Sequence, residues 1–547
     1  MIAIGSRAAS GDDFLYLAVD VGSYSLRAGL FDGRGERIAS AAREISVLNP
    51  QGGRYEQSST EIWDKVLEAC DEVLEAGDRG RVAGLSFDAT CSLVLLDGEG
   101  RPLSVSSSGD PERNVIMWMD HRAAQEAASI TSTRGEPVRY LGGAVSPEHE
   151  LPKLLWLKER MGGTYAEMGE AFDLADFLAY MATGSRARSI CTMVCKWGYL
   201  AHEGAGGWDE GFFTAAGLKD LYAKHLSGYA IRQVGEAVGA VCPDFAAKLG
   251  LDPACIVAAP LIDAHSGGIG SAGAALDPAR EDEWRDVLTR TLVIIMGTSN
   301  CHMALSAEPV FIDGVWGPYF GAMVPGLWLN EGGQNATGSL LDHILRERSI
   351  YRELTEESGE AIFAILNREV ARLREADFWF NKNLNVLPYF YGNRSPRADP
   401  DAWGMIDGLG LEDDIPSYAK LYLSTVQALA FGTRHIIEEM ERHGYRIEYV
   451  VATGGHIRNE LLLQEHANVL ERPVYLTQET ENMLLGGAVN AAAAAARYPT
   501  VIAAMANMTR MGRRITPQPE RYDLYRRKYE VFKRMYDYQR EIKGILG

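Results

Sequence analysis

A turn of glycine and hydroxyl residues follows an apolar strand in each half of the chain, and this repetition restricts the fold more than any other feature. In the first half, the apolar segment 14–21 leads into Gly22-Ser23-Tyr24-Ser25. In the second half, the apolar run Leu292–Met296 leads into Gly297-Thr298-Ser299-Asn300. With 547 residues, the chain also exceeds the length at which one hydrophobic core stops growing. We therefore expect a duplicated fold of two large domains.

The elements around the first turn are predicted to alternate between strands and helices. Strands at 14–21, 25–31 and 37–45 are expected to form a meander, because a glycine-containing turn joins the last two. A helix with apolar residues at helical spacing follows over 60–76, and a further strand follows over 82–87. This order of elements predicts the α/β class.

The rest of the chain is predicted to be rich in helices. Long amphipathic helices are expected at 418–444 and 459–470, and a charged helix is expected at 520–547. The polar segment 277–286 is the best candidate for the crossing between domains. We expect an N-terminal domain over 14–276, a C-terminal domain over 287–497 and a helical extension over 498–547.

The charge and the cysteines exclude several classes of function. The net charge of -20 argues against nucleic acid or an anionic membrane as a partner, because phosphates are repelled at long range. The seven cysteines are odd in number and dispersed, which predicts a reducing compartment rather than a disulfide framework. No apolar run reaches membrane-spanning length, and no leader is recognised at the N-terminus. We expect a cytoplasmic protein, with a homodimer as a candidate assembly.

Two carboxylates stand where chemistry is expected. Asp20 ends a buried strand, and the turn Gly22-Ser23 after it can present N–H groups to phosphate while the carboxylate holds hydrated Mg²⁺. An ordinary hairpin is the alternative. Asp263 ends a second apolar run and precedes the glycines Gly267-Gly268, so it can accept a hydroxyl proton during phosphoryl transfer. A helix cap is the alternative for Asp263.

The remaining glycine clusters favour a nucleotide site of an unusual type. One cluster is Glu331-Gly332-Gly333-Gln334. The other, Thr453-Gly454-Gly455-His456-Ile457-Arg458-Asn459, follows a strand and opens the helix predicted over 459–470, where backbone amides attract phosphate or ribose oxygens. Neither a Walker loop nor a dinucleotide-binding glycine pattern occurs in the sequence.

Taken in order, these motifs resemble the FGGY carbohydrate kinases over residues 14–497. The resemblance implies two actin-like, ribonuclease H-like domains with ATP and sugar in the cleft between them, Asp20 near Mg²⁺ and Asp263 as general base. Two positions depart from the family pattern: Ser23 replaces the usual Thr, and His456 replaces a third Gly. The residues implied around the nucleotide are Gly22, Ser23, Arg27, Gly297, Thr298, Gly332, Gly333, Gly454, Gly455 and Asn459.

Four further segments look like the ribulokinase branch, and D-ribulokinases in particular. They are Ser86-Phe87-Asp88-Ala89-Thr90-Cys91-Ser92, Trp118-Met119-Asp120-His121-Arg122-Ala123, Lys153-Leu154-Leu155-Trp156 and Gly392-Asn393-Arg394-Ser395-Pro396. The resemblance implies ATP-dependent phosphorylation of D-ribulose to D-ribulose 5-phosphate. The implied substrate-binding residues are Ala89, Thr90, Trp118, Asp120, Lys196, Asp263 and Glu331.

Other interpretations of these residues stay open. Lys196 is alternatively a surface lysine, Glu331 a carboxylate that caps a turn, and His121 with Arg122 an ion-paired structural element. The acceptor is alternatively ribitol or L-ribulose. An alternative to the kinase is a non-catalytic regulator on the same scaffold, because a fold does not determine a function. The carboxylate of Asp263 favours the enzyme, since a regulator has no need of it.

Overall fold

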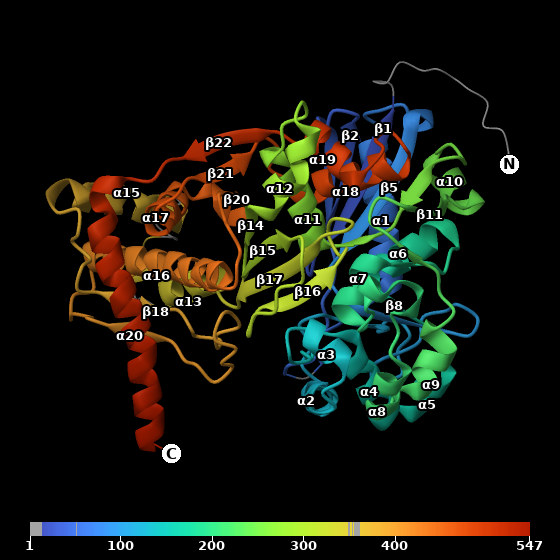
Figure 1. Cartoon of the computed structure of the whole chain (residues 1–547), viewed down its shortest axis with the longest axis horizontal. Coiled ribbons are helices and arrows are strands. Elements are labelled where there is room, and N and C mark those ends of the chain that lie inside the picture. Colours follow the sequence, from blue (N-terminus) through green and yellow to red (C-terminus); the bar gives the residue numbers. More distant parts are fainter. Residues whose placement is uncertain (1–13, 51, 348–349, 353, 355–360, 547) are drawn as a thin grey trace.

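The computed structural model describes residues 14–50, 52–347, 350–352, 354 and 361–546, arranged around two mixed sheets (Figure 1). In the first sheet, β1 is antiparallel to β2 and parallel to β5, and β2 is antiparallel to β3. The predicted meander is therefore confirmed. The order of the strands is β11 (Ala237–Ala240), β12 (Ile256–Ala258), β5 (Val82–Ala89), β1 (Leu15–Val21), β2 (Ser25–Asp32) and β3 (Arg37–Glu44), with β13 (Leu261–Ile262) also paired to β5.

The second sheet repeats the pairing pattern of the first. Strand β14 is antiparallel to β15 and parallel to β20, and β15 is antiparallel to β17. This repetition confirms the expected duplicated α/β fold of two domains. The strands run in the order β16 (Trp316–Phe320), β17 (Trp328–Gln334), β15 (Asn300–Ser306), β14 (Thr291–Met296), β20 (Tyr449–Thr453), β21 (Val474–Thr477) and β22 (Met511–Ile515).

The N-terminal half carries an additional layer that is drawn at the lower right of Figure 1. It contains a small sheet, in the order β4 (Glu56–Gln57), β7 (Val115–Ile116), β6 (Leu93–Asp97) and β8 (Met168–Asp173). The main helices of this half are α1 (Ser59–Leu74), α2 (Ala124–Ser132), α3 (Glu136–Tyr140), α4 (Glu150–Arg160), α5 (Gly162–Glu167), α6 (Leu174–Thr183), α7 (Ile190–Lys196), α8 (Glu210–Ala215) and α10 (Pro243–Leu249).

The C-terminal half is rich in helices, as the periodicity predicts. Helix α16 begins after Asp414, whose side chain accepts a hydrogen bond from the Ser417 N–H in a capping box. The long helices cover the expected segments to within a few residues. The helices are α12 (Trp284–Thr289), α13 (Gly338–Arg346), α15 (Ile362–Ala376), α16 (Ile415–Arg442), α17 (Glu460–Leu470), α18 (Asn482–Ala494), α19 (Val501–Met508) and α20 (Tyr522–Leu546), and two short strands are β18 (Asn385–Leu387) and β19 (Met405–Asp407).

The segment 498–547 differs from the predicted helical extension, because it also contains a strand. Strand β22 pairs antiparallel with β21, and its Ile515 is buried in the core of the C-terminal sheet. The two arginines that precede Ile515 are exposed and hide the strand pattern in the sequence. Helix α20 buries Tyr525, Tyr529 and other side chains at helical spacing on the C-terminal half. The part of the segment from β22 onward is thus built into that half, whereas α19 packs against α18 and the N-terminal half.

Helices α11 (Asp263–Ala272) and α18 join the two sheets. Helix α11 packs against β14, whereas α18 packs against β1 and β5, so each helix contacts the sheet of the opposite half. The two helix backbones meet at glycines, because a Cβ on Gly486 would collide with the Ser266 carbonyl and one on Gly270 with the Asn482 carbonyl. The side-chain amide of Asn490 adds hydrogen bonds to Ser86 Oγ at 2.9 Å and to the Ala259 carbonyl at 2.8 Å.

In the part of the chain that the structure describes, no helix is both long and apolar enough to cross a lipid bilayer.

We predict that the close contact of α11 and α18 tolerates no side chain at its glycines. The substitution Gly486→Ala forces the helices apart and should destabilise the protein by about 1–3 kcal/mol, seen as a lower Tm in calorimetry. Gly163→Ala is the matched control, because a Cβ at Gly163 in α5 meets nothing within 4 Å. Equal Tm values for both variants and the wild type would contradict this account of the interface.

Candidate active site

A cavity of about 270 Å³ lies between the two halves, at the start of α11. Its walls come from both halves of the chain, so neither half forms it alone. Nine residues that the sequence predicted for the nucleotide or the substrate line this one cavity. They are Gly22, Ser23, Thr90, Trp118, Lys196, Asp263, Gly297, Thr298 and Glu331.

Three carboxylates lie close together beside the cavity, and of these Asp263 lines it. Asp20 in β1 stands in register with Asp88 in the parallel strand β5, and Asp263 is the first residue of α11. Burial raises the pKa of Asp88 well above its usual value, and the charges of Asp20 and Asp263 raise it further. Burial together with the neighbouring Asp20 raises the pKa of Asp263 to about 6. Asp263 is therefore an ionised base near neutral pH.

The chain geometry explains why Asp263 points into the cavity. Strand β13 ends at Ile262, and α11 begins at once, so Asp263 occupies the first turn of the helix. A carboxylate is favoured there by the helix dipole. The Ala264 N–H donates to Asp263 Oδ1 at 2.7 Å, and among the residues that the structure describes none donates a hydrogen bond to Asp263 Oδ2. That oxygen is available to a ligand.

The wall opposite Asp263 carries Lys196, Trp316 and Glu331. Lys196 ends α7 and is only 6% exposed, with its Nζ 5.0 Å from the centre of the Trp316 ring. The Arg394 guanidinium stacks on the same ring at 3.5 Å. A cation on an aromatic face is stabilised by the ring quadrupole, so the indole holds both basic groups in place.

Glu331 is held by two basic side chains. Arg394 donates to Glu331 Oε1 at 2.7 Å, and His265 Nε2 lies 3.5 Å from Glu331 Oε2. Burial raises the pKa of Glu331, but the contact with His265 and the charge of Arg394 outweigh it, so this pKa lies well below its usual value. Glu331 is therefore a carboxylate that is held in place and stays ionised. His265 is in turn placed by Cys191, whose Sγ lies 3.1 Å from its Nδ1.

Each of the two glycine turns is closed by a hydrogen bond from its glycine, although the bond reaches three residues ahead in the first turn and two in the second. The Gly22 N–H donates to the Ser25 carbonyl, and the Gly297 N–H donates to the Ser299 carbonyl, each at 3.0 Å. The Ser23 hydroxyl accepts a hydrogen bond from Trp118 Nε1 at 2.9 Å. Both turns face the cavity from opposite halves of the chain. This arrangement can hold a chain of phosphate groups between the two domains.

The third glycine cluster lies next to the second turn. Gly454 has a φ of 97°, and a Cβ there would strike the Met296 backbone, so the cluster is packed against the end of β14. A Cβ on Gly455 meets nothing within 4 Å, which leaves room for a ligand. Asn459 caps α17 by accepting from the Leu462 N–H, and it donates to the Tyr422 hydroxyl at 2.7 Å. The nucleotide roles of these residues stay predictions.

Several predicted residues lie outside the cavity lining. The carboxylate of Asp120 is fully buried, accepts from the Tyr55 N–H at 2.7 Å and forms an ion pair with Arg122 at 2.7 Å. This contact matches the structural alternative for Arg122. Arg27 pairs with Glu481 at 2.9 Å and lies 3.8 Å from Asp20. The other predicted residues that do not line the cavity are Asp20, Ala89, Gly332, Gly333, Gly454, Gly455 and Asn459.

The local surroundings of Ala89, Gly332 and Gly333 explain their positions. Ala89 ends β5 beside Val21 and the cavity residue Thr90. Gly332 leaves space for Ile436 of α16, and Gly333 leaves space for the Arg394 side chain. The two glycines thus allow close packing within β17, and their predicted contact with the nucleotide remains untested.

Sequence reasoning assigned no role to Trp316, Arg394, His265 or Asp88. Arg394 and Asp88 stand in segments that the family resemblance singled out, and a carboxylate inside the apolar strand β5 was a usable signal. Trp316 carries no such signal, since a tryptophan in a strand is ordinarily a core residue. Its place becomes visible only through the cation contacts on its ring.

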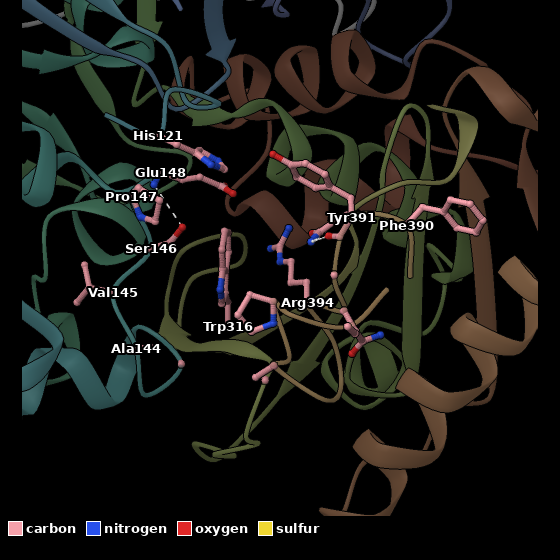
Figure 2. Close-up of a pocket in the computed structure, with 18 residues that line it drawn as sticks. His121, Ala144, Val145, Ser146, Pro147, Glu148, Trp316, Phe390, Tyr391 and Arg394 are labelled. Carbon is pink, nitrogen blue, oxygen red and sulfur yellow. Dashed lines mark hydrogen bonds between the residues drawn. The ribbon is translucent and has the colours of Figure 1, made fainter. Parts of the chain in front are cut away.

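Part of the cavity wall also borders a second, outer pocket of about 630 Å³, shown in Figure 2. Glu148, Trp316 and Arg394 line both spaces. In Figure 2, Ser146, Pro147 and Glu148 approach from one side, and Phe390 and Tyr391 lie on the other. The two spaces therefore share part of one wall.

The three carboxylates fit a magnesium ion that is held jointly with phosphate. Among the described residues, no group of three or more His, Cys, Asp or Glu side chains is arranged to hold a metal alone. Mg²⁺ commonly takes one or two carboxylates and completes its shell with water and substrate phosphates. The buried Asp20 beside the Gly22 turn suits that mode of binding.

Family models match both halves of the chain. The N-terminal domain model of the FGGY family of carbohydrate kinases covers residues 15–270, and the C-terminal domain model of the same family covers residues 292–495.

Curated relatives match nearly the whole chain. An FGGY carbohydrate kinase domain-containing protein of Danio rerio is 45% identical over 541 residues, which are 97% of this chain and 99% of the relative. The human protein of the same description is 43% identical, covering 97% of this chain and 98% of the relative. A D-ribulokinase of Saccharomyces cerevisiae is 33% identical over 88% of this chain and 72% of its own length.

Solved structures of sugar kinases share the fold. A xylulose kinase from Brucella ovis has a TM-score of 0.80 at 20% identity, covering 96% of this chain and all of its own. A glycerol kinase from Plasmodium falciparum, solved with ADP, has a TM-score of 0.75 at 14% identity and covers 95% of this chain and 98% of its own. Both halves of the molecule, the cavity between them and these matches lead to one conclusion: the chain belongs to the FGGY family of carbohydrate kinases.

Proposed function

We propose that this protein transfers the γ-phosphoryl group of ATP to a terminal hydroxyl of a pentulose, with D-ribulose as the preferred acceptor. The observation that carries the proposal is the position of Asp263, whose carboxylate faces the same cavity as Lys196, Glu331 and the two glycine turns. A substrate hydroxyl beside Asp263 would lie between the Asp263 carboxylate, which is the proposed base, and the two glycine turns that are proposed to bind phosphate. The D-ribulokinase from yeast among the relatives supports this acceptor class.

Asp263 acts as the general base in this proposal. With a pKa of about 6, the Asp263 carboxylate is still mostly ionised at neutral pH. It is also more basic than the carboxylate of an exposed aspartate. Phosphoryl transfer depends mainly on positioning and charge stabilisation, so a base of this strength is sufficient. Burial and the charges of Asp20 and Asp263 raise the pKa of Asp88, which favours its neutral form beside Asp20 and limits the repulsion within the cluster.

The turns and the three carboxylates hold the nucleotide in this proposal. The turn at Gly22 and the turn at Gly297 would offer the phosphates the N–H and hydroxyl groups of Ser23 and Thr298, because the glycine N–H groups are used within the turns. Gly455, which leaves open space, and the N-terminus of α17 face the nucleoside side. A bound Mg²⁺ at Asp20 would neutralise the phosphate charges.

Lys196 and Glu331 select the acceptor in this proposal. Both side chains are almost fully buried, so a hydroxyl that points the wrong way leaves a polar group without a partner. Such a mismatch costs about 1–3 kcal/mol, which corresponds to roughly 5- to 150-fold in specificity. Substrates that differ in one hydroxyl are therefore ranked clearly, although slower turnover of ribitol or L-ribulose is compatible with the site.

The first prediction of this proposal concerns the general base. Asp263→Asn should lower kcat by about 10²- to 10⁴-fold, because the amide cannot accept the hydroxyl proton. Binding of sugar and ATP, measured by calorimetry, should change little. Asp252→Asn on the exposed turn before β12 is the control and should retain full activity. A variant with more than about a tenth of wild-type kcat would exclude Asp263 as the base.

The second prediction concerns pH. Because the base acts when ionised and its pKa is raised to about 6, activity is present above this pH and is lost as the pH falls through it. We expect kcat/KM for the sugar to fall about tenfold per pH unit below pH ~6. Circular dichroism at each pH controls for unfolding. A flat profile between pH 5 and 7.5 in folded protein would be inconsistent with this role.

The third prediction concerns the acceptor. Measured under one condition, kcat/KM should be highest for D-ribulose and lower for L-ribulose, D-xylulose, ribitol and glycerol. Lys196→Met should raise the KM for D-ribulose and leave the KM for ATP nearly unchanged, because the lysine faces the sugar side of the cavity. A clear preference for another acceptor would remove the substrate assignment and leave the kinase assignment intact.

A further inference from the structure

A third pocket, of about 640 Å³, opens on the N-terminal half beside α4, and its lining is strongly basic. We call it the basic pocket. Among the described residues that line it, none is Asp or Glu, although the whole chain carries 20 more acidic than basic charges. The lining residues are Arg54, Ser107, His121, Arg122, Ala124, Gln125, Trp156, Arg160 and Met161.

The guanidinium groups of the basic pocket are organised around one indole ring. The guanidinium carbon of Arg54 lies 5.5 Å from the centre of the Trp156 ring, and that of Arg122 lies 5.1 Å from it. Arg160 stands four residues after Trp156 in α4, so both side chains project from the same face of the helix. Trp156 thereby holds two cations at the site while a third comes from the next turn.

The charge of Arg122 is neutralised by carboxylates that do not line the pocket, whereas the charge of Arg160 is not neutralised. Arg122 pairs with Asp120 at 2.7 Å and with Glu56 at 2.8 Å, and both carboxylates are buried away from the pocket. These contacts fix the guanidinium of Arg122, which is itself almost fully buried. Arg160 is exposed and forms no ion pair with any residue that the structure describes. Its charge is free to meet a ligand.

The lining offers almost only hydrogen-bond donors. The guanidinium groups of Arg54 and Arg160 are joined by the amide of Gln125 and the hydroxyl of Ser107, which donate as well as accept. Most N–H groups of Arg122 are used by Asp120, Glu56 and the Val105 carbonyl, so Arg122 contributes mainly its charge. A neutral sugar needs acceptors and donors in balance, whereas a phosphate group needs donors alone. Guanidinium groups bind phosphate oxygens in pairs, with charge-assisted hydrogen bonds. A nucleic acid does not suit this pocket, because the acidic protein around it repels a long polyanion.

We propose that the basic pocket is a second small-molecule site, which binds the phosphate group of a phosphate monoester. The site is distinct from the acceptor cavity, and it does not depend on the function proposed above. The segment 118–122 lies between the two sites: its Trp118 lines the acceptor cavity, and its His121 and Arg122 line the basic pocket. His121 also borders the outer pocket and is labelled in Figure 2.

The test is calorimetric binding of inorganic phosphate and of glycerol phosphate to the full chain, with glycerol as the neutral probe. All titrations are repeated with a saturating non-hydrolysable ATP analogue and Mg²⁺, which cover the phosphate turns of the active site. The test variant is Arg160→Gln. The matched control is Lys158→Gln, which removes the same charge from the same helix outside the pocket lining.

We expect phosphate and glycerol phosphate to bind with the nucleotide analogue present, and glycerol not to bind at the basic pocket. Arg160→Gln should weaken phosphate binding at least about tenfold, because one charge-assisted contact is lost, while Lys158→Gln leaves it unchanged. Basal turnover and Tm of both variants serve as folding controls. Three results overturn the proposal: no binding by wild type up to ~10 mM, complete competition by the nucleotide analogue, or equal affinity in Arg160→Gln.

Discussion

The close crossing of α11 and α18 is the contact on which the rest of the structure depends. It brings two backbones together at Gly270 and Gly486, and it ties each half of the chain to the sheet of the other half. Helix α11 also carries Asp263 in its first turn, at the edge of the cavity. The same contact that joins the two domains therefore fixes the distance between the proposed base and the turn at Gly297. Protein interiors are packed too densely to absorb a shift there.

The active site balances buried charges of both signs. Burial raises the pKa of Asp20, Asp88 and Asp263, and the charge of Asp20 raises the pKa of Asp88 and Asp263 further, whereas His265 and Arg394 lower the pKa of Glu331. A buried charge is stable only with a partner, so this arrangement creates one group that is ready to accept a proton and one that stays ionised. The proposed proton transfer requires a group such as Asp263 that can accept a proton, and the proposed recognition of a hydroxyl requires a group such as Glu331 that stays ionised.

The sequence predicted the elements better than it predicted the contacts. The strand-and-turn repeats revealed the duplicated α/β fold, because an apolar strand followed by glycine is a local signal. Strand β22 was missed because exposed arginines interrupt its pattern, and the crossing of α18 onto the first sheet has no local signal at all. At the site, Asp263, Lys196 and Glu331 were found through family motifs, whereas Trp316 was not, because its importance lies in what stacks on it. Asp120 was placed near the substrate, yet its carboxylate is occupied by Arg122 and the Tyr55 N–H.

The product of the reaction tests the central claim most directly. The protein is incubated with ATP, Mg²⁺ and D-ribulose, ADP is followed with time, and the sugar product is examined by mass spectrometry and phosphorus NMR. The account predicts one ADP per sugar phosphate, with the phosphate on the terminal hydroxyl, and little ADP without sugar. ADP formation without a sugar phosphate, or no turnover of any sugar or polyol of three to six carbons, would contradict it.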